Sequence, residues 1–217
     1  MRCLLEITFS SARKIEKRSV GGRKAEKDEF PWTVAVSGPI VCSGALISDH
    51  HVLTSAHCAI KRIYGVPCEE ATLVSSYEKL PFEDIVVISG MGEGCSVDTK
   101  DGCKVFNVKD MFIHPKHNPC TGDYDIALLE LSSSMNSQQG LPICMPKEDE
   151  DIPTSRNRMT SSGFGYNPEH PGERYLEALN LTMEGIERTR ARIITKSRGK
   201  SICTVRLYWY GLVKCID

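Results

Sequence analysis

Short apolar stretches separated by turn residues run along much of the chain. The clearest are rich in Val and Ile and alternate with Gly-, Pro- and Asn-containing turns: Thr33–Val36, Gly44–Ile47, Val52–Ser55, Asp84–Ile88, Val105–Ile113 and Ile126–Leu131. Stretches of this length and composition favour strands over helices. Many short strands at close spacing predict an all-β fold, either a barrel or a sandwich.

One stretch interrupts this pattern. Residues 132–140, Ser-Ser-Ser-Met-Asn-Ser-Gln-Gln-Gly, are polar and show neither strand nor helix periodicity. Such a segment is typical of a connection between two folding units. We therefore expect an inter-domain linker here.

Composition and charge narrow the class of protein. The chain has 217 residues, of which 41% are hydrophobic, so it can bury a core. Its 27 basic and 28 acidic residues leave a formal charge of −1. The chain therefore has no net positive charge that would attract nucleic acid or an acidic membrane surface. No uninterrupted apolar run approaches the ~18 residues of a membrane span. We therefore expect neither a nucleic-acid partner nor a membrane partner.

The ten cysteines point to disulfide bonds. They are scattered, at positions 3, 42, 58, 68, 95, 103, 120, 144, 203 and 215, and none forms a Cys-x-x-Cys pair. The lack of such pairs argues against zinc ribbons and thioredoxin-like sites, and the even number favours an exported, disulfide-bonded protein. Buried free thiols are the alternative. His114, His117 and His170 lack metal-ligand spacing, so we expect no metal and no cofactor.

The first residues give little support for export. The apolar run from Leu4 to Phe9 is interrupted by Glu6 and is too short for a secretory core, and basic residues follow at 13–18. We therefore expect the precursor to begin upstream of Met1.

Residues 42–58 carry the first candidate for chemistry. Two apolar stretches are joined by the polar turn 48–51, and Cys42 and Cys58 stand at their outer ends. A bridge between them would fix the turn that carries His57, as the accurate placement of a general base requires. A single His is more often structural, but its position directly before a bridging cysteine weakens that reading.

Asp125 is the second candidate. It precedes the strongly apolar run Ile126–Leu131, so its carboxylate would lie at the mouth of a strand. From there it could accept the Nδ1–H of a histidine, which sets the tautomer and stabilises the imidazolium. A solvated turn aspartate is the alternative.

Five ordered motifs together resemble the trypsin/chymotrypsin family of serine endopeptidases, over about residues 18–204. Thr54–Cys58 resembles the histidine motif and Asp125–Leu129 the aspartate motif. The other three resemble the activation junction, the first strand and the glycine turn that opens the second barrel: Arg18–Gly22, Phe30–Val34 and Ser162–Gly165.

This resemblance implies two antiparallel β-barrels of chymotrypsin type, with His57 as the base and Asp125 as its orienting acid. It divides the chain into a pro-segment (1–18), a peptidase domain (19–204) and a divergent tail (205–217). Within the domain, the first barrel covers about residues 30–131 and the second, incomplete barrel starts at about 141. An activating protease would cut after Arg18 and expose Ser19 as the new amino terminus.

The same resemblance implies a disulfide pattern. Cys42–Cys58 is the histidine-loop bridge, and Cys3–Cys144 would tether the pro-segment after cleavage. For the remaining cysteines of the first half we expect the pairs Cys68–Cys95 and Cys103–Cys120, a guess that the spacing alone does not decide.

The nucleophile of the family is missing. Lys200–Thr204 resembles the lead-in to the Gly-Asp-Ser-Gly-Gly turn, but Leu207 stands at the serine position. Val205 replaces the oxyanion glycine, and Arg206 replaces the aspartate that receives the new amino terminus. Ser201 matches the base of the specificity pocket, where a small neutral residue favours apolar or aromatic side chains. The abrupt departure after Thr204 resembles a shifted frame or altered splice, and we expect the apolar tail to leave an exposed sheet edge.

Two weaker signals complete the pattern. Six cations between Arg188 and Lys200 form either a heparin-like or acidic-partner patch or simply a solvated face. Asn180-Leu181-Thr182 is a sequon, which in an exported protein predicts a surface glycan.

Three interpretations follow. The first is a secreted serine endopeptidase, acting on proteins or peptides, in a form that lacks its nucleophile and is therefore inactive. The second is a non-catalytic homologue that binds a protein partner through the remaining cleft or the basic segment. The third is an altered gene product that does not fold.

Overall fold

Strands make up nearly all of the regular structure, as the apolar pattern predicts. The computed structural model describes residues 6–7, 22–63, 77–89, 95–145, 158–165, 174–187, 192–196, 202–206 and 212–215. Within these residues the helical segments are two short 3-10 turns, η1 (Ala56–Cys58) and η2 (Phe82–Asp84). No helix in the described part of the chain has the length and apolar character needed to span a bilayer.

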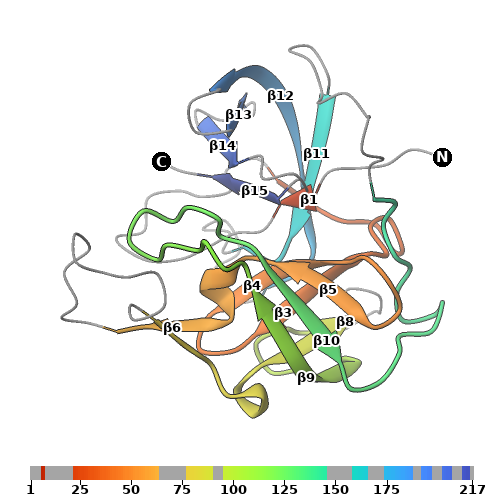
Figure 1. The fold of residues 1–217 in the computed structure, drawn as a ribbon. Coiled ribbons are helices and arrows are strands. Elements are labelled where there is room, and N and C mark those ends of the chain that lie inside the picture. The colour runs from red at the N-terminus through yellow and green to blue at the C-terminus, as the bar shows by residue number, and fades with distance from the viewer. Residues whose placement is uncertain are drawn as a thin grey trace.

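The first half of the chain folds into a closed antiparallel barrel with the strand order β10-β5-β4-β3-β8-β9 (Figure 1). Its strands are β3 (Thr33–Ser37), β4 (Val41–Leu46), β5 (His51–Thr54), β8 (Val86–Ser89), β9 (Val105–Ile113) and β10 (Ala127–Leu131). Alternate residues of β10 are buried, and β9 follows the same alternation on both sides of a local break. Their inward side chains, such as Met111 and Leu129, belong to the barrel core.

A smaller hairpin extends this barrel. It consists of β6 (Ile60–Arg62) and β7 (Tyr77–Lys79), which pair in antiparallel fashion. The backbone of Leu80 bonds to Ala59 at 3.0 Å, so the hairpin is anchored directly beside η1.

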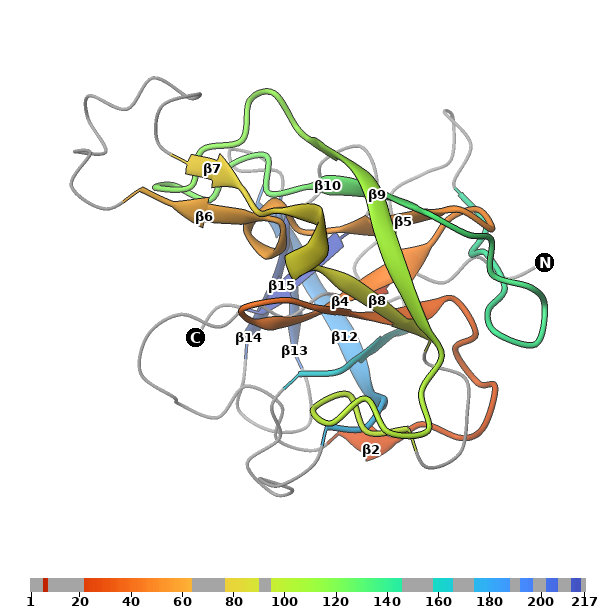
Figure 2. The same cartoon turned by 90° about the horizontal axis from the view of Figure 1, so that it is seen from below.

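Strands of the second half of the chain form a sheet together with two short strands from its first 24 residues, in the order β1-β15-β14-β13-β12-β11 with β2 pairing to β12 (Figure 1 and Figure 2). Its strands are β1 (Glu6–Ile7), β2 (Arg23–Lys24), β11 (Arg158–Gly163), β12 (Glu177–Glu187), β13 (Arg192–Lys196), β14 (Ile202–Arg206) and β15 (Leu212–Cys215). β1 lies beside β11 (Figure 1) without a described ladder between them. One barrel is therefore closed, and the described strands of the second half form an open, curled sheet.

All five residues of β3 are buried because this strand lies between the two halves. One side faces the barrel core, and Ala35 on the other side packs with Phe164 from the second half. Two buried hydrogen bonds join the halves at the same place. Thr33 Oγ1 lies 2.8 Å from Ser162 Oγ, and the Phe164 amide donates to the Ser43 hydroxyl at 2.9 Å.

The strand predictions for the first half are confirmed, with small shifts at the ends. Asp84 lies in η2, because the backbone after Pro81 makes a 3-10 turn in which Ile85 N–H bonds to Phe82 at 3.2 Å. The strand therefore starts at Val86. Residues 132–140, predicted to be a linker, run along the first barrel, where Met135 is buried and its amide bonds to Asp49 at 2.8 Å.

The prediction of an exposed edge in the tail is wrong for the described part. Val205 and Arg206 lie in β14, and β15 pairs with β14 on one side and with β1 in parallel on the other. The tail strand β15 therefore has a paired strand on each side and is not an exposed edge of the sheet.

Candidate active site

Strand register brings His57 and Asp125 together, although 68 residues separate them. β5 and β10 are antiparallel neighbours, and Thr54 at the end of β5 stands opposite Ala127 at the start of β10. His57 lies three residues beyond Thr54, and Asp125 lies two residues before Ala127. Both therefore leave the same end of the strand pair and meet there.

The Asp125 carboxylate holds His57 at two points. Its Oδ1 accepts the His57 backbone N–H at 2.9 Å, and its Oδ2 lies 2.6 Å from the ring nitrogen Nδ1. The Asp125 side chain is 10% exposed and that of His57 is 21% exposed. Because a carboxylate can only accept, Nδ1 carries the hydrogen, and in the neutral form of the ring the lone pair lies on Nε2.

A compact turn positions Asp125. Asn118 Oδ1 accepts the backbone N–H of Cys120 at 2.8 Å, and the Asn118 amide bonds to Asp123 at 2.9 Å. Tyr124 has a φ of 51°, a left-handed conformation that turns the chain into β10. The next residue, Asp125, is thereby aimed at η1.

His117 lies behind this turn and is 1% exposed. Its Nδ1 bonds to the Asp123 carbonyl at 3.1 Å, and its Nε2 has no hydrogen-bond partner. Burial lowers the pKa of His117, while the negative charge of Asp125 acts in the opposite direction. The buried ring is therefore neutral at pH 7, with an unsatisfied acceptor in the core.

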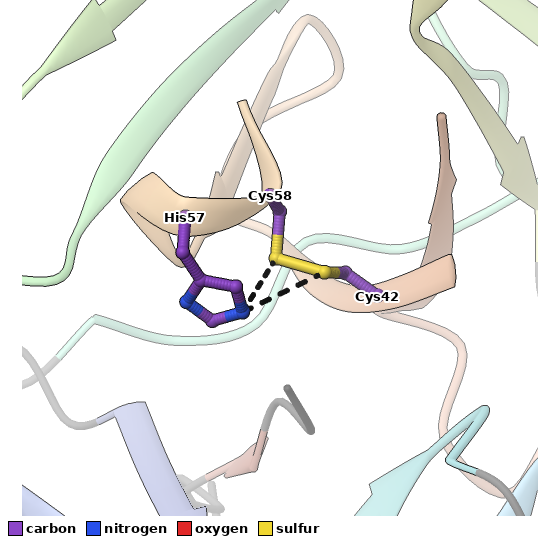
Figure 3. Close-up of side chains that lie close together, drawn as sticks. All are labelled: Cys42, His57 and Cys58. Atoms are coloured by element: carbon purple, nitrogen blue, oxygen red, sulfur yellow. Dashed lines mark hydrogen bonds between the residues drawn. A yellow bond between two sulfur atoms is a disulfide. The ribbon is translucent and has the colours of Figure 1, made fainter. Parts of the chain in front are cut away.

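The other ring nitrogen of His57 faces a disulfide (Figure 3). Cys42 and Cys58 are bonded to each other, and Nε2 lies 3.3 Å from Cys58 Sγ and 3.9 Å from Cys42 Sγ. Neither sulfur of a disulfide carries a hydrogen, so the neutral ring accepts nothing from them. His57 thus has the geometry of an oriented base, and its Nε2 lies against the two sulfurs of the bridge.

Among the described residues, one potential metal-ligand atom from each of Cys42, His57 and Cys58 lies within 4.8 Å of the others, but the two sulfurs are bonded to each other and are not thiolate ligands. We predicted no metal because the sequence has no Cys-x-x-Cys or His spacing of that kind. The group combines β4 with η1, which local spacing does not reveal.

Several predicted site residues lie outside the described part of the chain: Arg18, Ser19, Cys3, Ser201 and Leu207. Val205 and Arg206, by contrast, lie in β14. Val205 stands opposite Ile193 of β13 and Val213 of β15, so β14 is paired on both sides.

The disulfide predictions need correction beyond Cys42–Cys58. Cys95 bonds to Cys103, because the intervening turn, with left-handed residues at Lys100 and Gly102, brings their Cα atoms to 4.6 Å. The guessed pairs Cys68–Cys95 and Cys103–Cys120 are therefore both wrong, although Cys120 is itself disulfide-bonded.

The tether between Cys144 and Cys3 is not formed either. Cys144 is a free, partly exposed cysteine. The neighbouring backbone bonds from Ile143 to Leu46, at 2.8 Å, hold this segment against the first barrel.

Comparison with known proteins agrees with this architecture. A family profile described as Trypsin matches residues 19–206. Mannan-binding lectin serine protease 1 of Mus musculus is 33% identical over 158 residues, 71% of this chain and 21% of that protein. Phenoloxidase-activating enzyme of Bombyx mori is 30% identical over 175 residues, 76% of this chain and 37% of that protein.

Coagulation factor XI of Bos taurus is 30% identical over 161 residues, 70% of this chain and 22% of that protein. The chain thus spans between about a fifth and about two fifths of the length of these curated relatives. Among solved structures, human heparin binding protein superposes with a TM-score of 0.60 at 18% identity, covering 84% of this chain and 74% of that one. At that identity the likeness concerns the fold alone.

Proposed function

The chain belongs to the trypsin family, and from that premise we propose that it is a secreted protein of chymotrypsin fold whose peptidase site keeps its base but lacks a nucleophile. The family acts on protein substrates. In an intact site His57 would take the proton of a serine hydroxyl and Asp125 would stabilise the imidazolium. In this form the protein has no peptidase activity.

The pairing of β14 is the observation that carries this proposal. The oxyanion hole of the family is built from free backbone N–H groups in the turn around the serine. Here Val205, at the position of the oxyanion glycine, lies in a strand with partners on both sides. The backbone N–H groups of a strand paired on both sides donate hydrogen bonds to its neighbours. The Val205 amide is therefore not available to a developing oxyanion.

The side chain at the serine position supports the same conclusion. Leu207 has no group that can attack a carbonyl. Removing one triad member leaves roughly 10³–10⁴-fold catalysis over water, which comes from the oxyanion hole and substrate binding. Because the hole is also absent in our proposal, this residual catalysis is lost too.

A serine-directed probe tests the proposal. The protein, cleaved after Arg18, is incubated with a fluorophosphonate and analysed by intact mass, with trypsin as the positive control. We expect no adduct. Leu207→Ser should also remain unlabelled, because the Val205 amide stays in its ladder. A stoichiometric serine adduct on the unaltered chain that disappears in His57→Ala would overturn the proposal.

Activation and specificity are part of the same proposal. An activating protease would cut after Arg18 and expose Ser19, but the residue at the usual aspartate position is Arg206, whose positive charge cannot pair with a new ammonium group. By its place in the sequence Ser201 matches the base of the specificity pocket, where a small neutral residue favours apolar or aromatic side chains in an active relative. Cleavage should therefore change stability little, which thermal unfolding before and after cleavage measures.

Secretion is supported by the disulfides and by the sequon. Cys42–Cys58 and Cys95–Cys103 are disulfides of the kind that persists in oxidising compartments. Asn180 and Thr182 are both exposed, whereas Leu181 between them is buried. We propose an N-glycan on Asn180. Expression in secreting cells should give a product whose mass falls on amidase treatment, and Asn180→Gln should abolish that fall.

A second candidate function is binding without catalysis. It is favoured by the retained barrel and by the six cations between Arg188 and Lys200, two of which, Arg192 and Lys196, end β13. The ligand would be acidic. The chain is applied to immobilised heparin beside a variant in which all six basic residues are replaced by Gln. Retention that is lost in the variant supports binding, and elution of both proteins at the same salt concentration rules it out.

A further inference from the structure

The segment that carries Asp125 contains two histidines that contact it from within. Residues 114–126 connect β9 to β10 and place Asp125 beside His57. Within this segment His117 is 1% exposed and His114 is half-buried. We propose that residues 114–126 are an acid-sensitive latch, which holds Asp125 against His57 while both histidines are neutral and opens when they are protonated. In the open state its internal hydrogen bonds are lost and both rings reach water.

The closed latch accommodates His117 as a neutral ring. Its Nδ1 donates to the Asp123 carbonyl at 3.1 Å, and Tyr77 of β7 packs against the ring at a centroid distance of 5.7 Å. Its Nε2 finds no hydrogen-bond partner among the described residues. A second hydrogen there would bury a positive charge without a partner, which is costly. Burial lowers the pKa of His117 more than the negative charge of Asp125 raises it, and the neighbouring His57 lowers it further.

His114 is also bound in its neutral form. Its Nδ1 accepts the backbone N–H of Lys116 at 3.1 Å, so the hydrogen of the neutral ring is on Nε2. Protonation would place a hydrogen on Nδ1 and remove this bond. It would also put a positive charge near the Lys116 ammonium group, which lies 5.7 Å from the Tyr124 ring on which His114 stacks. Burial lowers the pKa of His114, and the charge of Lys116 lowers it further.

Both histidines act on Asp125 through the two residues that precede it. His117 holds the Asp123 carbonyl, and His114 stacks on the Tyr124 ring at a centroid distance of 4.7 Å and an interplanar angle of 11°. Tyr124 has a φ of 51°, a left-handed backbone conformation that costs free energy for a bulky side chain. The stack offsets this cost in the closed latch. When the stack is lost, Tyr124 relaxes and the Asp125 carboxylate leaves its position at η1.

The direction and size of the effect follow from proton binding. In the open state both rings have the ordinary histidine pKa of about 6.5, and in the closed state the pKa of each ring is lower. Below about pH 6.5 the open state therefore binds more protons than the closed state. Each histidine then raises the opening constant by up to about tenfold per pH unit until its lowered pKa is reached. The latch is thus closed at neutral pH and opens as the pH falls.

Amide hydrogen exchange of the whole chain tests the latch. It is followed by NMR at pH 7.5, 6 and 5 and corrected for the intrinsic exchange rate at each pH. The reporters are the amides of Asn118 and Gly122, which are bonded within the latch, and the comparison is the Leu46 amide of the barrel, bonded to the Trp32 carbonyl at 2.8 Å. We expect the opening constant of the two latch amides to rise at least about tenfold between pH 7.5 and 5, and to exceed that of the Leu46 amide at pH 5. Latch amides that exchange as slowly as Leu46 at pH 5, or whose opening constant does not change with pH, refute the proposal.

A variant that cannot be protonated gives a second test. His114→Phe/His117→Phe keeps both rings, so we expect its latch amides to have the same opening constant at pH 5 and at pH 7.5. His50→Asn, outside the latch, should keep the acid response of the unaltered chain. Retention of that response in the double Phe variant refutes the latch.

The Nδ1–H resonance of His57, observed with isotope-labelled histidine, reports the contact with Asp125 directly. It should disappear in acid from the unaltered chain and persist in the double Phe variant. Its persistence in the unaltered chain at pH 5, or its loss from both proteins, excludes the proposed opening. The exchange data on the unaltered chain do not require that the variants fold. None of these signals depends on peptidase activity, so their outcome is separate from that of the proposed function.

Discussion

Replacing His117 by Phe should stabilise the protein, and more so in acid. The His117 ring is 1% exposed and packs against Tyr77 with a centroid distance of 5.7 Å, a contact that a phenyl ring can keep. His117→Phe removes the unsatisfied Nε2, whose burial costs about 1–3 kcal/mol. It also loses the bond from Nδ1, but the Asp123 carbonyl keeps the Asn118 amide at 2.9 Å. We expect a net gain of about 1 kcal/mol at pH 7.5.

The pH dependence follows from the direction of the pKa shift. Burial lowers the pKa of His117 in the folded state, so below the unfolded value of about 6.5 the unfolded chain binds more protons. The native protein therefore loses up to about 1.4 kcal/mol of stability per pH unit between that value and the lowered folded pKa. At pH 5 the gain from His117→Phe should therefore be larger than the gain at pH 7.5.

Urea unfolding at pH 7.5, 6 and 5, followed by tryptophan fluorescence with the disulfides intact, measures this difference. The partly exposed His50, whose Nδ1 lies 3.0 Å from Asp49 Oδ1, provides the control. His50→Asn should not make the protein more resistant to acid. A stability gain from His117→Phe that is the same at all three pH values, or that shrinks in acid, refutes the reasoning.

Three substitutions in the first barrel test the packing around the site by urea or thermal unfolding. Gly44→Ala places a Cβ 2.7 Å from a side chain of β5 and should cost about 1–3 kcal/mol; an unchanged midpoint contradicts the tight approach. Ser43→Ala leaves the buried Phe164 amide without its acceptor and should also cost about 1–3 kcal/mol, whereas Ser43→Thr should cost less if the bond joins the halves as described. Cys42→Ala/Cys58→Ala opens a loop of 16 residues and should lower the free energy of unfolding by about 3 kcal/mol. A smaller decrease than that of Ser43→Ala contradicts this value.

The first barrel was predictable because apolar and polar residues alternate along its strands in the sequence, as buried and exposed side chains do in the structure. β9 and β10 show this most clearly. β3 is buried on both faces, and its short apolar run still indicates a strand. The open second sheet was harder, since the β1 pairing with β15 joins the two ends of the described chain.

The candidate site was predictable only in part. His57 and Asp125 were identified by their motifs, but their contact depends on the Thr54–Ala127 register, which no local pattern specifies. Cys95–Cys103 was missed because its bridge depends on left-handed residues in the intervening turn. The buried His117 could have been suspected only from its place in the turn before Asp125.

Peptide turnover tests the central proposal most directly. The protein cleaved after Arg18 is assayed against a mixed library of peptides with apolar, aromatic and basic residues before the scissile bond, beside the His57→Ala variant prepared identically. The proposal predicts that both preparations show the same background rate. Turnover by the unaltered chain that exceeds this background and is lost in His57→Ala would contradict it.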